Sequence, residues 1–154
     1  MIILGSILFS LIFATSISAD IGFINYQIIY DRYVEAVEFD KKFQEKRTRY
    51  EEKLAEFSDE IQDARDKNAS EKKIEKLTEA MEKEMTPLQQ ELIQMQNESL
   101  YAIRQKIAAT AQRVATEQGL SVILNQEVIV YCGYDITAFV LDKLNRDARV
   151  KSDE

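Results

Sequence analysis

The spacing of hydrophobic residues divides the chain into three regions. The first reads IGFINYQIIY, and its β-branched and aromatic residues predict a short strand at residues 21–24, followed by a helix or turn through Tyr30. From about Val34 hydrophobic residues recur at intervals of three and four, which is the period of a packed helix. Residues 121–145 are again compact and β-branched. The pattern therefore predicts long helices between two short α/β segments.

A heptad repeat in the middle region predicts a coiled-coil hairpin. On the first helix the repeat comprises Phe43, Arg47, Tyr50, Leu54, Phe57, Ile61, Ala64 and Asn68. On the second helix it comprises Ile74, Leu77, Met81, Leu88, Leu92, Met95, Ser99 and Ala102. The polar segment 68–70 lies between them, and Ser70 is the predicted N-cap of the second helix. Because so short a connection makes the helices antiparallel neighbours, we expect an arm over residues 34–117 with Tyr50 facing Leu88.

Two residues predict the shape and the end of the second helix. Pro87 lacks a backbone donor and predicts a kink, and Gly119 is predicted to end the helix.

The segment after Gly119 is predicted to contain two strands and a helix. LSVILNQ and EVIVYC read as two strands of a hairpin, with Cys132 buried at a strand end. Asp135 is predicted to cap a final helix that ends near Asn145. Residues 146–154 lack periodicity and are predicted to form a disordered tail.

The two end segments, residues 20–33 and 118–145, are expected to meet as one small head. So few residues rarely bury a stable core without a metal, a disulfide or a partner. The chain has no His and a single Cys, so we expect several copies to associate through the head. The residues expected in its core or interface are Ile21, Phe23, Ile24, Val122, Leu124, Val128, Val130, Ile136, Val140 and Leu144.

Composition and charge argue against several classes of fold and function. Charged residues make up 31% of the chain, with 4 Gly and 1 Pro, which favours a mostly α structure over a β-sandwich. The net charge of −7 argues against a nucleic-acid partner, which requires a basic surface. Carboxylates dominate between Glu35 and Lys67, and no cluster of Lys and Arg stands out there. Without His, a Gly-rich phosphate loop or a nucleophile–base pair, we expect neither an enzyme nor a cofactor or metal site.

The first 19 residues are typical of a secretory signal peptide. An apolar run at residues 2–14 is too short to span a membrane and precedes small residues ending at Ala19. No Lys or Arg comes before the run. We expect cleavage near Ala19; a signal-anchored membrane adaptor is the alternative.

The chain resembles the Skp/OmpH family of periplasmic chaperones. The resemblance covers residues 20–145 and rests above all on VATEQGLSVILNQEVIVYCGYDITAFVLDKLN, in which DIT precedes an apolar helix ending in LN. It implies an α+β, mostly α fold, with a coiled-coil hairpin arm on a small strand-containing head and a trimer shaped like a jellyfish. It also implies an ATP-independent holdase, periplasmic after signal cleavage, that keeps unfolded outer-membrane proteins from aggregating in a cavity between the arms.

The charge of this chain differs from that of the family, and this difference affects which partners we expect. The best-known members are basic, whereas this chain is acidic, which makes lipopolysaccharide or anionic membrane binding doubtful. A structural coiled-coil protein of the cell envelope without clients would have the same arms. If clients are held, the candidate contact residues on the arm are Phe39, Phe43, Tyr50, Met85, Ile93 and Tyr101.

Overall fold

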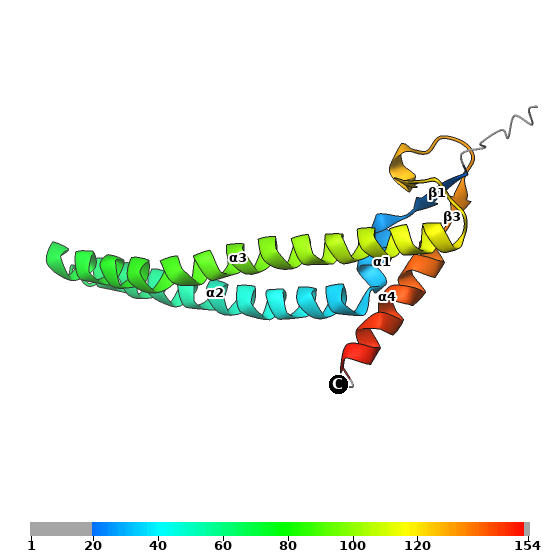
Figure 1. The fold of residues 1–154 in the computed structure, drawn as a ribbon. Coiled ribbons are helices and arrows are strands. Elements are labelled where there is room, and N and C mark those ends of the chain that lie inside the picture. The colour runs from blue at the N-terminus through cyan, green and yellow to red at the C-terminus, as the bar shows by residue number, and fades with distance from the viewer. Residues whose placement is uncertain (1–19, 153–154) are drawn as a thin grey trace, which may run out of the picture.

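A long helical hairpin projects from a small head that contains both ends of the described chain (Figure 1). The computed structural model describes residues 20–152. The head begins with strand β1 (Ile21–Ile24) and helix α1 (Tyr26–Arg32), and the arm consists of α2 (Val34–Asp66) and α3 (Glu71–Glu117). The chain then returns to the head as β2 (Val122–Asn125), the 3-10 helix η1 (Gln126–Val128), β3 (Tyr134–Asp135) and α4 (Thr137–Ser152).

A tight turn joins the two helices of the arm. Asn68 adopts a left-handed conformation with φ of 51°, which Asn tolerates better than most residues. The Asn68 amide donates to Arg65 O and the Ala69 amide to Ala64 O, both at 2.9 Å. These bonds satisfy carbonyls that the end of α2 would leave free. Ser70 occupies the N-cap position of α3, as predicted, although its side chain makes no capping bond.

The two helices of the arm pack along a thin apolar seam. Ile61, Ala64 and Met85 are buried there, and α3 continues without a break through Pro87. Ion pairs cross the hairpin between Lys46 and Glu91 and between two further pairs, Lys53–Glu84 and Lys106–Glu35. Exposed ion pairs contribute at most about 1 kcal/mol each, so the seam is the main source of the hairpin's stability.

The sheet of the head has an order that the sequence does not reveal. β1 lies in the centre, and both β2 and β3 pair with it in parallel. Phe23 of β1 therefore lies beside Leu124 on one side and Asp135 on the other. Because β1 occupies the place between them, residues 126–133 must cross from one edge of the sheet to the other.

The predicted hairpin of LSVILNQ and EVIVYC is therefore wrong in its second strand. Residues 126–128 form η1 and residues 129–133 form an irregular crossing, in place of a strand. Cys132, predicted to be buried at a strand end, is exposed and has φ of 66°. The β-branched run VIV indicates a strand in isolation, but it pairs with no strand among residues 20–152.

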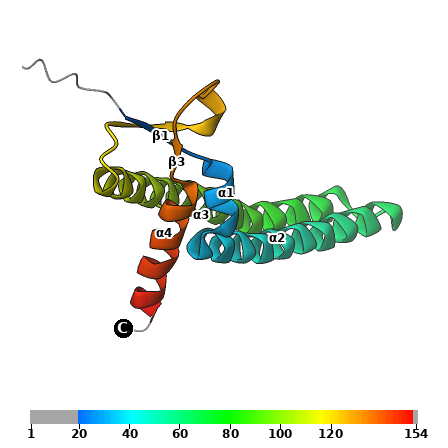
Figure 2. The same cartoon turned by 90° about the vertical axis from the view of Figure 1, so that its right-hand side faces the viewer.

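The core lies where β1, α1, α3 and α4 meet (Figure 2). Its most completely buried large side chains are Tyr33, Ile29, Ile107 and Val140. Phe39 at the start of α2 extends this core into the root of the arm. The head and the root of the arm thus share one continuous core, which fixes the direction in which the arm leaves the head.

Two asparagines take part in hydrogen bonds between segments that are distant in sequence. Asn25 Oδ1 accepts from Ile28 N at 2.9 Å and caps α1, while Asn25 N donates to Thr137 Oγ1 at 2.8 Å. Asn145 Oδ1 accepts from Val34 N at 3.0 Å, at the first residue of α2. These bonds tie α1, α2 and α4 together through backbone donors that would otherwise lack a partner.

Two tyrosines bind carboxylates at the root of the arm. Tyr30 Oη donates to Asp40 Oδ1 at 2.9 Å, and burial, followed by this hydrogen bond, raises the pKa of Tyr30. Burial also raises the pKa of Tyr33, with the hydrogen bond to Glu35 as the next cause. Both phenols are neutral donors at physiological pH, and each tethers a residue of the first half of α2 to the α1 region.

The final helix is longer than predicted. Asp135 Oδ1 accepts a hydrogen bond from Thr137 N at 2.9 Å, so its side chain binds a free donor at the start of α4 as predicted, although Ile136 occupies the N-cap position. α4 continues to Ser152, so the prediction of a disordered tail is wrong for residues 146–152. The added turns are held against α3 by the pair Arg113–Asp147, 2.7 Å apart. Residues 153–154 lie outside the described residues.

Two isoleucines of α3 provide a matched test of this core. Ile107 is 1% exposed, whereas Ile93 is 52% exposed. Ile107→Ala leaves a cavity and should lower the free energy of unfolding by about 2–5 kcal/mol. Ile93→Ala should change it by less than about 0.5 kcal/mol, because the side chain is already in water. Urea denaturation of both variants measures the difference, and equal losses would contradict the described core.

Candidate functional site

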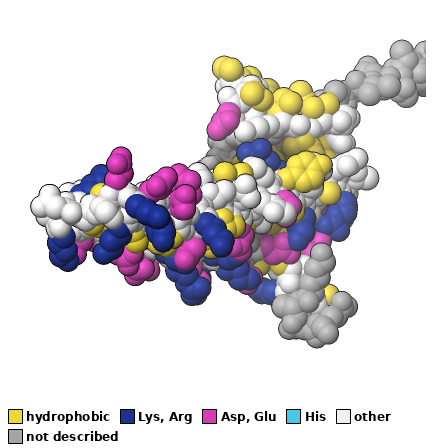
Figure 3. Space-filling model, turned by 90° about the vertical axis from the view of Figure 1, so that its left-hand side faces the viewer, with side chains coloured by type: hydrophobic (Ala, Val, Ile, Leu, Met, Phe, Trp, Pro, Cys, Tyr) yellow, Lys and Arg dark blue, Asp and Glu magenta, His cyan; other side chains and the backbone are white. Residues whose placement is uncertain are grey.

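The head exposes a concentration of large hydrophobic side chains. Figure 3 views the molecule from the tip of the arm and shows them over the part of the head above the arm. Val130 is 100% exposed and Tyr131 is 90% exposed, both in the crossing between η1 and β3. The residues that we call the head patch are Ile21, Val122, Leu124, Val128, Val130, Tyr131 and Tyr134. Exposed apolar surface of this kind is typical of a protein interaction site.

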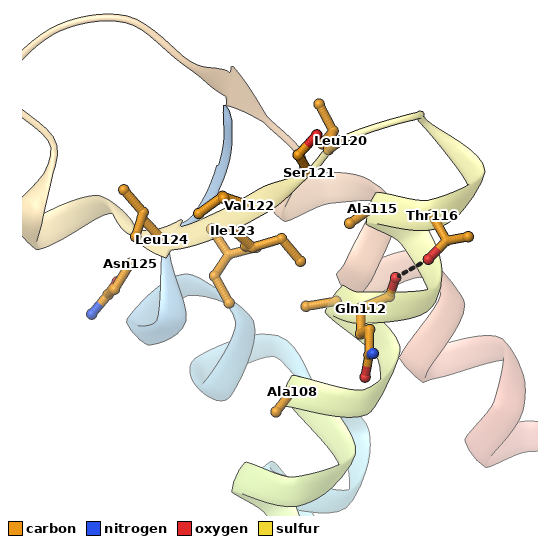
Figure 4. Close-up of a pocket in the computed structure, with 12 residues that line it drawn as sticks. Ala108, Gln112, Ala115, Thr116, Leu120, Ser121, Val122, Ile123, Leu124 and Asn125 are labelled. Atoms are coloured by element: carbon orange, nitrogen blue, oxygen red, sulfur yellow. Dashed lines mark hydrogen bonds between the residues drawn. The ribbon is translucent and has the colours of Figure 1, made fainter. Parts of the chain in front are cut away.

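A groove runs between β2 and the end of α3 (Figure 4). Its volume is about 510 Å³. α3 contributes small residues, including Ala108 and Ala115, and the side chain of Ile123 points into the space between strand and helix (Figure 4). β2 is an edge strand, so one side of its backbone has no partner strand among residues 20–152. An unpaired strand edge beside a groove is a template for another extended chain.

The ten residues predicted for the trimer core fall into two groups. Ile24, Ile136, Val140 and Leu144 are buried within the single chain, and Phe23 is half-buried. The other five are exposed and belong to the head patch: Ile21, Val122, Leu124, Val128 and Val130. The first group builds the head of each chain, and only the second is available for contact with another molecule.

The predicted client-facing residues divide in the same way. Phe39 is buried in the core with its ring 5.7 Å from that of Phe43, which is itself half-buried, and Met85 is buried in the arm. Neither Phe39 nor Met85 offers surface to a client, which corrects the prediction for both. Tyr50 is half-buried. Of the six, Tyr101 presents the largest exposed fraction, 66%.

The spacing of α3 explains the burial of Met85. Met81, Met85, Leu88 and Leu92 follow one another at intervals of four, three and four, so Met85 occupies a position of the heptad seam. The predicted repeat passed directly from Met81 to Leu88. Ile93, which follows Leu92, lies off the seam and is exposed.

A second groove lies midway along the arm, and we call it the mid-arm groove. It has a volume of about 320 Å³. Tyr50, Leu88 and Leu92 form its apolar floor, and their shared lining agrees with the predicted pairing of Tyr50 with Leu88.

Three cations of α2 surround the mid-arm groove. They are Lys46, Arg49 and Lys53, spaced three and four residues apart, which places them on one helix face. This cluster of Lys and Arg was not predicted, because the charge was summed along the segment rather than around the helix. The spacing of these three residues was the signal that could have revealed the cluster.

Metal sites and membrane-spanning helices are both absent from residues 20–152. These residues contain no group of three or more Cys, Asp or Glu side chains placed to hold a metal ion. None of the helices in this part of the chain is long and apolar enough to cross a membrane. The predicted signal peptide, residues 1–19, lies outside the described residues.

Comparisons with known proteins agree with this architecture. The family model "Outer membrane protein (OmpH-like)" matches residues 20–144, which is most of the chain. The chain belongs to the OmpH-like family. The resemblance inferred from the C-terminal segment is therefore confirmed.

A solved structure shares the fold of this OmpH-like protein. A candidate outer membrane chaperone (OmpH-like) from Caulobacter crescentus superposes with a TM-score of 0.59 at 14% sequence identity. The match covers 84% of this chain and 86% of that chain. No curated protein matches the sequence. The predicted mostly α fold, with long helices on a small strand-containing head, is confirmed.

Proposed function

We propose that this OmpH-like protein is an ATP-independent holdase chaperone of the periplasm. It acts as a homotrimer, joined through the heads, whose arms enclose unfolded outer-membrane proteins and keep them from aggregating. Membership of the OmpH-like family is the observation that carries the proposal. The name of the Caulobacter crescentus protein, which shares the fold, points in the same direction.

The division of the chain supports an assembly with projecting arms. Residues 20–33 and 118–145 form the part that joins the copies, residues 34–117 form the arm, and residues 1–19 are a signal peptide cleaved near Ala19. The head patch is uncovered in the single chain, and Val130 has its whole side chain in water. Association of three copies through this patch and the edge of β2 would remove that apolar surface from water.

Client holding needs accessible apolar surface distributed along the arm. A holdase that binds the unfolded state prevents aggregation by mass action and needs no nucleotide. Ile93 and Tyr101 are 52% and 66% exposed on α3, and the floor of the mid-arm groove lies nearby along the arm. Many weak contacts with such residues would hold an extended chain without selecting one folded shape.

The proposal is tested by removing the exposed side chains of the arm. Ile93→Ser and Tyr101→Ser together should weaken the suppression of aggregation of an unfolded outer-membrane protein severalfold, while the free energy of unfolding changes by less than about 1 kcal/mol. Light scattering after dilution of the client from urea measures suppression. Phe139→Ser, at a 57% exposed position on α4, is the matched control and should leave suppression unchanged.

The same assay separates the holdase from a structural coiled-coil protein of the envelope. A structural protein would give no suppression with the unaltered chain, whatever its state of assembly. Suppression that survives in the double variant would place the client contacts elsewhere than on the exposed face of α3.

A further inference from the structure

The mid-arm groove contains a guanidinium without a carboxylate partner. Lys46 and Lys53 are each bound across the hairpin, to Glu91 and Glu84. Arg49 lies between them on the same face of α2 and has no ion pair with any residue of the described chain. Both lysines are therefore already paired across the hairpin, and Arg49 is the cation left to meet a ligand.

The local charge of the groove opposes that of the whole protein. Its lining carries three cations and one carboxylate, Glu91, in a chain with a net charge of −7. Figure 3 shows basic and acidic side chains interleaved along the arm, so the groove is a local feature and not part of a broad basic field. A guanidinium presents several donors in one plane and binds a carboxylate through two of them.

The floor of the groove restricts the ligand further. Tyr50, Leu88 and Leu92 present apolar surface directly beside the cations. A free anion would leave that surface in water, whereas an apolar side chain would cover it. The volume of about 320 Å³ lies near the lower end of small-ligand pockets, about 300–1,000 Å³, so it suits one or two side chains and no folded element.

We propose that the mid-arm groove binds an apolar or aromatic side chain of an unfolded polypeptide that stands next to an Asp or Glu, whose carboxylate is bound by Arg49. The inference rests on the proposed holdase function and adds the chemistry of the segments that the arm selects. An acidic chaperone thereby favours acidic–aromatic stretches of its clients at one point of each arm. Basic stretches are repelled there by the unpaired guanidinium of Arg49.

The test uses short peptides and the full mature chain. Three blocked peptides differ at one dipeptide, Phe–Asp, Phe–Asn or Ala–Asp, and their binding is measured by fluorescence anisotropy and by methyl shifts of Leu88 and Leu92. Arg49→Gln should weaken binding of the Phe–Asp peptide about fivefold, as expected for loss of a charge-assisted hydrogen bond, and should leave the Phe–Asn peptide unchanged. The Ala–Asp peptide should bind the unaltered chain more weakly than the Phe–Asp peptide.

A neighbouring arginine provides the matched control. Arg47 lies two residues away on α2, is exposed and pairs with Glu51 within the same helix at 2.8 Å. Arg47→Gln changes the net charge equally, and it should leave all three affinities unchanged. Equal losses for the Phe–Asp and Phe–Asn peptides, a similar loss with Arg47→Gln, or no shift at Leu88 and Leu92 would each overturn the inference.

Two further measurements distinguish this inference from a phosphate-binding groove and from the proposed holdase function. Vesicles containing lipopolysaccharide are titrated with the same variants, and Arg49-dependent vesicle binding without a peptide response would assign the groove to a phosphate ligand and overturn the proposal. Aggregation of an unfolded outer-membrane protein is followed in parallel. If the chain suppresses aggregation but binds the three peptides equally, only the proposed role of the mid-arm groove is contradicted. If the unaltered chain does not suppress aggregation, the proposed holdase function itself is contradicted.

Discussion

Val130→Glu should separate the proposed trimer into folded monomers. The side chain of Val130 is 100% exposed in the single chain, so the substitution removes no contact within that chain. In an assembly joined through the head patch, it would place an unpaired carboxylate in an apolar interface. Burying an uncompensated charge costs about 3–5 kcal/mol, which corresponds to about 100- to 4,000-fold weaker association at each interface.

Sedimentation equilibrium of the mature protein measures the effect, and circular dichroism checks that the monomers keep their helices. Val150→Glu is the matched control, because Val150 lies on α4 and is 63% exposed outside the head patch. It should leave the mass in solution unchanged. A trimer that persists in Val130→Glu would place the interface elsewhere than on the head patch.

Removal of the outer arm should abolish client holding and preserve assembly. Replacing residues 44–96 with a short Gly/Ser loop deletes the mid-arm groove and Ile93 but keeps the core around Ile29, Ile107 and Val140. The ends of the deletion lie close together because α2 and α3 are antiparallel, as the Lys46–Glu91 pair at that level shows. We therefore expect the shortened protein to fold and to associate through the same head patch.

Sedimentation and light scattering measure the two properties on the same sample. The shortened protein should sediment as a trimer and should lose nearly all suppression of client aggregation. Ile107→Ala in the full-length chain is the control for destabilisation alone, since it weakens the core and leaves the arm in place. Full suppression by the armless protein would contradict a cavity formed by the arms.

The arm could be predicted from the sequence because its packing repeats. Heptad spacing and a short polar turn define two antiparallel helices without any knowledge of the rest of the chain. The same logic failed for Met85 only because the repeat was followed from Met81 to Leu88 without the position between them. The cation cluster around Arg49 was overlooked because the charge was summed along α2 rather than around it.

The head could be predicted only in part, because its sheet depends on contacts between distant segments. The strand at residues 122–125 is visible in its own composition, but insertion of β1 between β2 and β3 is set by pairing across almost the whole chain. That insertion converts the predicted second strand into a crossing and exposes Val130 and Cys132. The helical continuation of α4 to Ser152 likewise involves contacts with distant segments, because Asp147 pairs with Arg113 and Ala148 packs against the core.

The stoichiometry of the complex with a client tests the central claim most directly. The mature protein is mixed with an unfolded outer-membrane protein diluted from urea, without nucleotide, and the soluble complex is weighed by native mass spectrometry. The account predicts three copies of the chain with one client, and no such complex for the armless protein. A monomeric chain, or a trimer that leaves the client to aggregate, would contradict it.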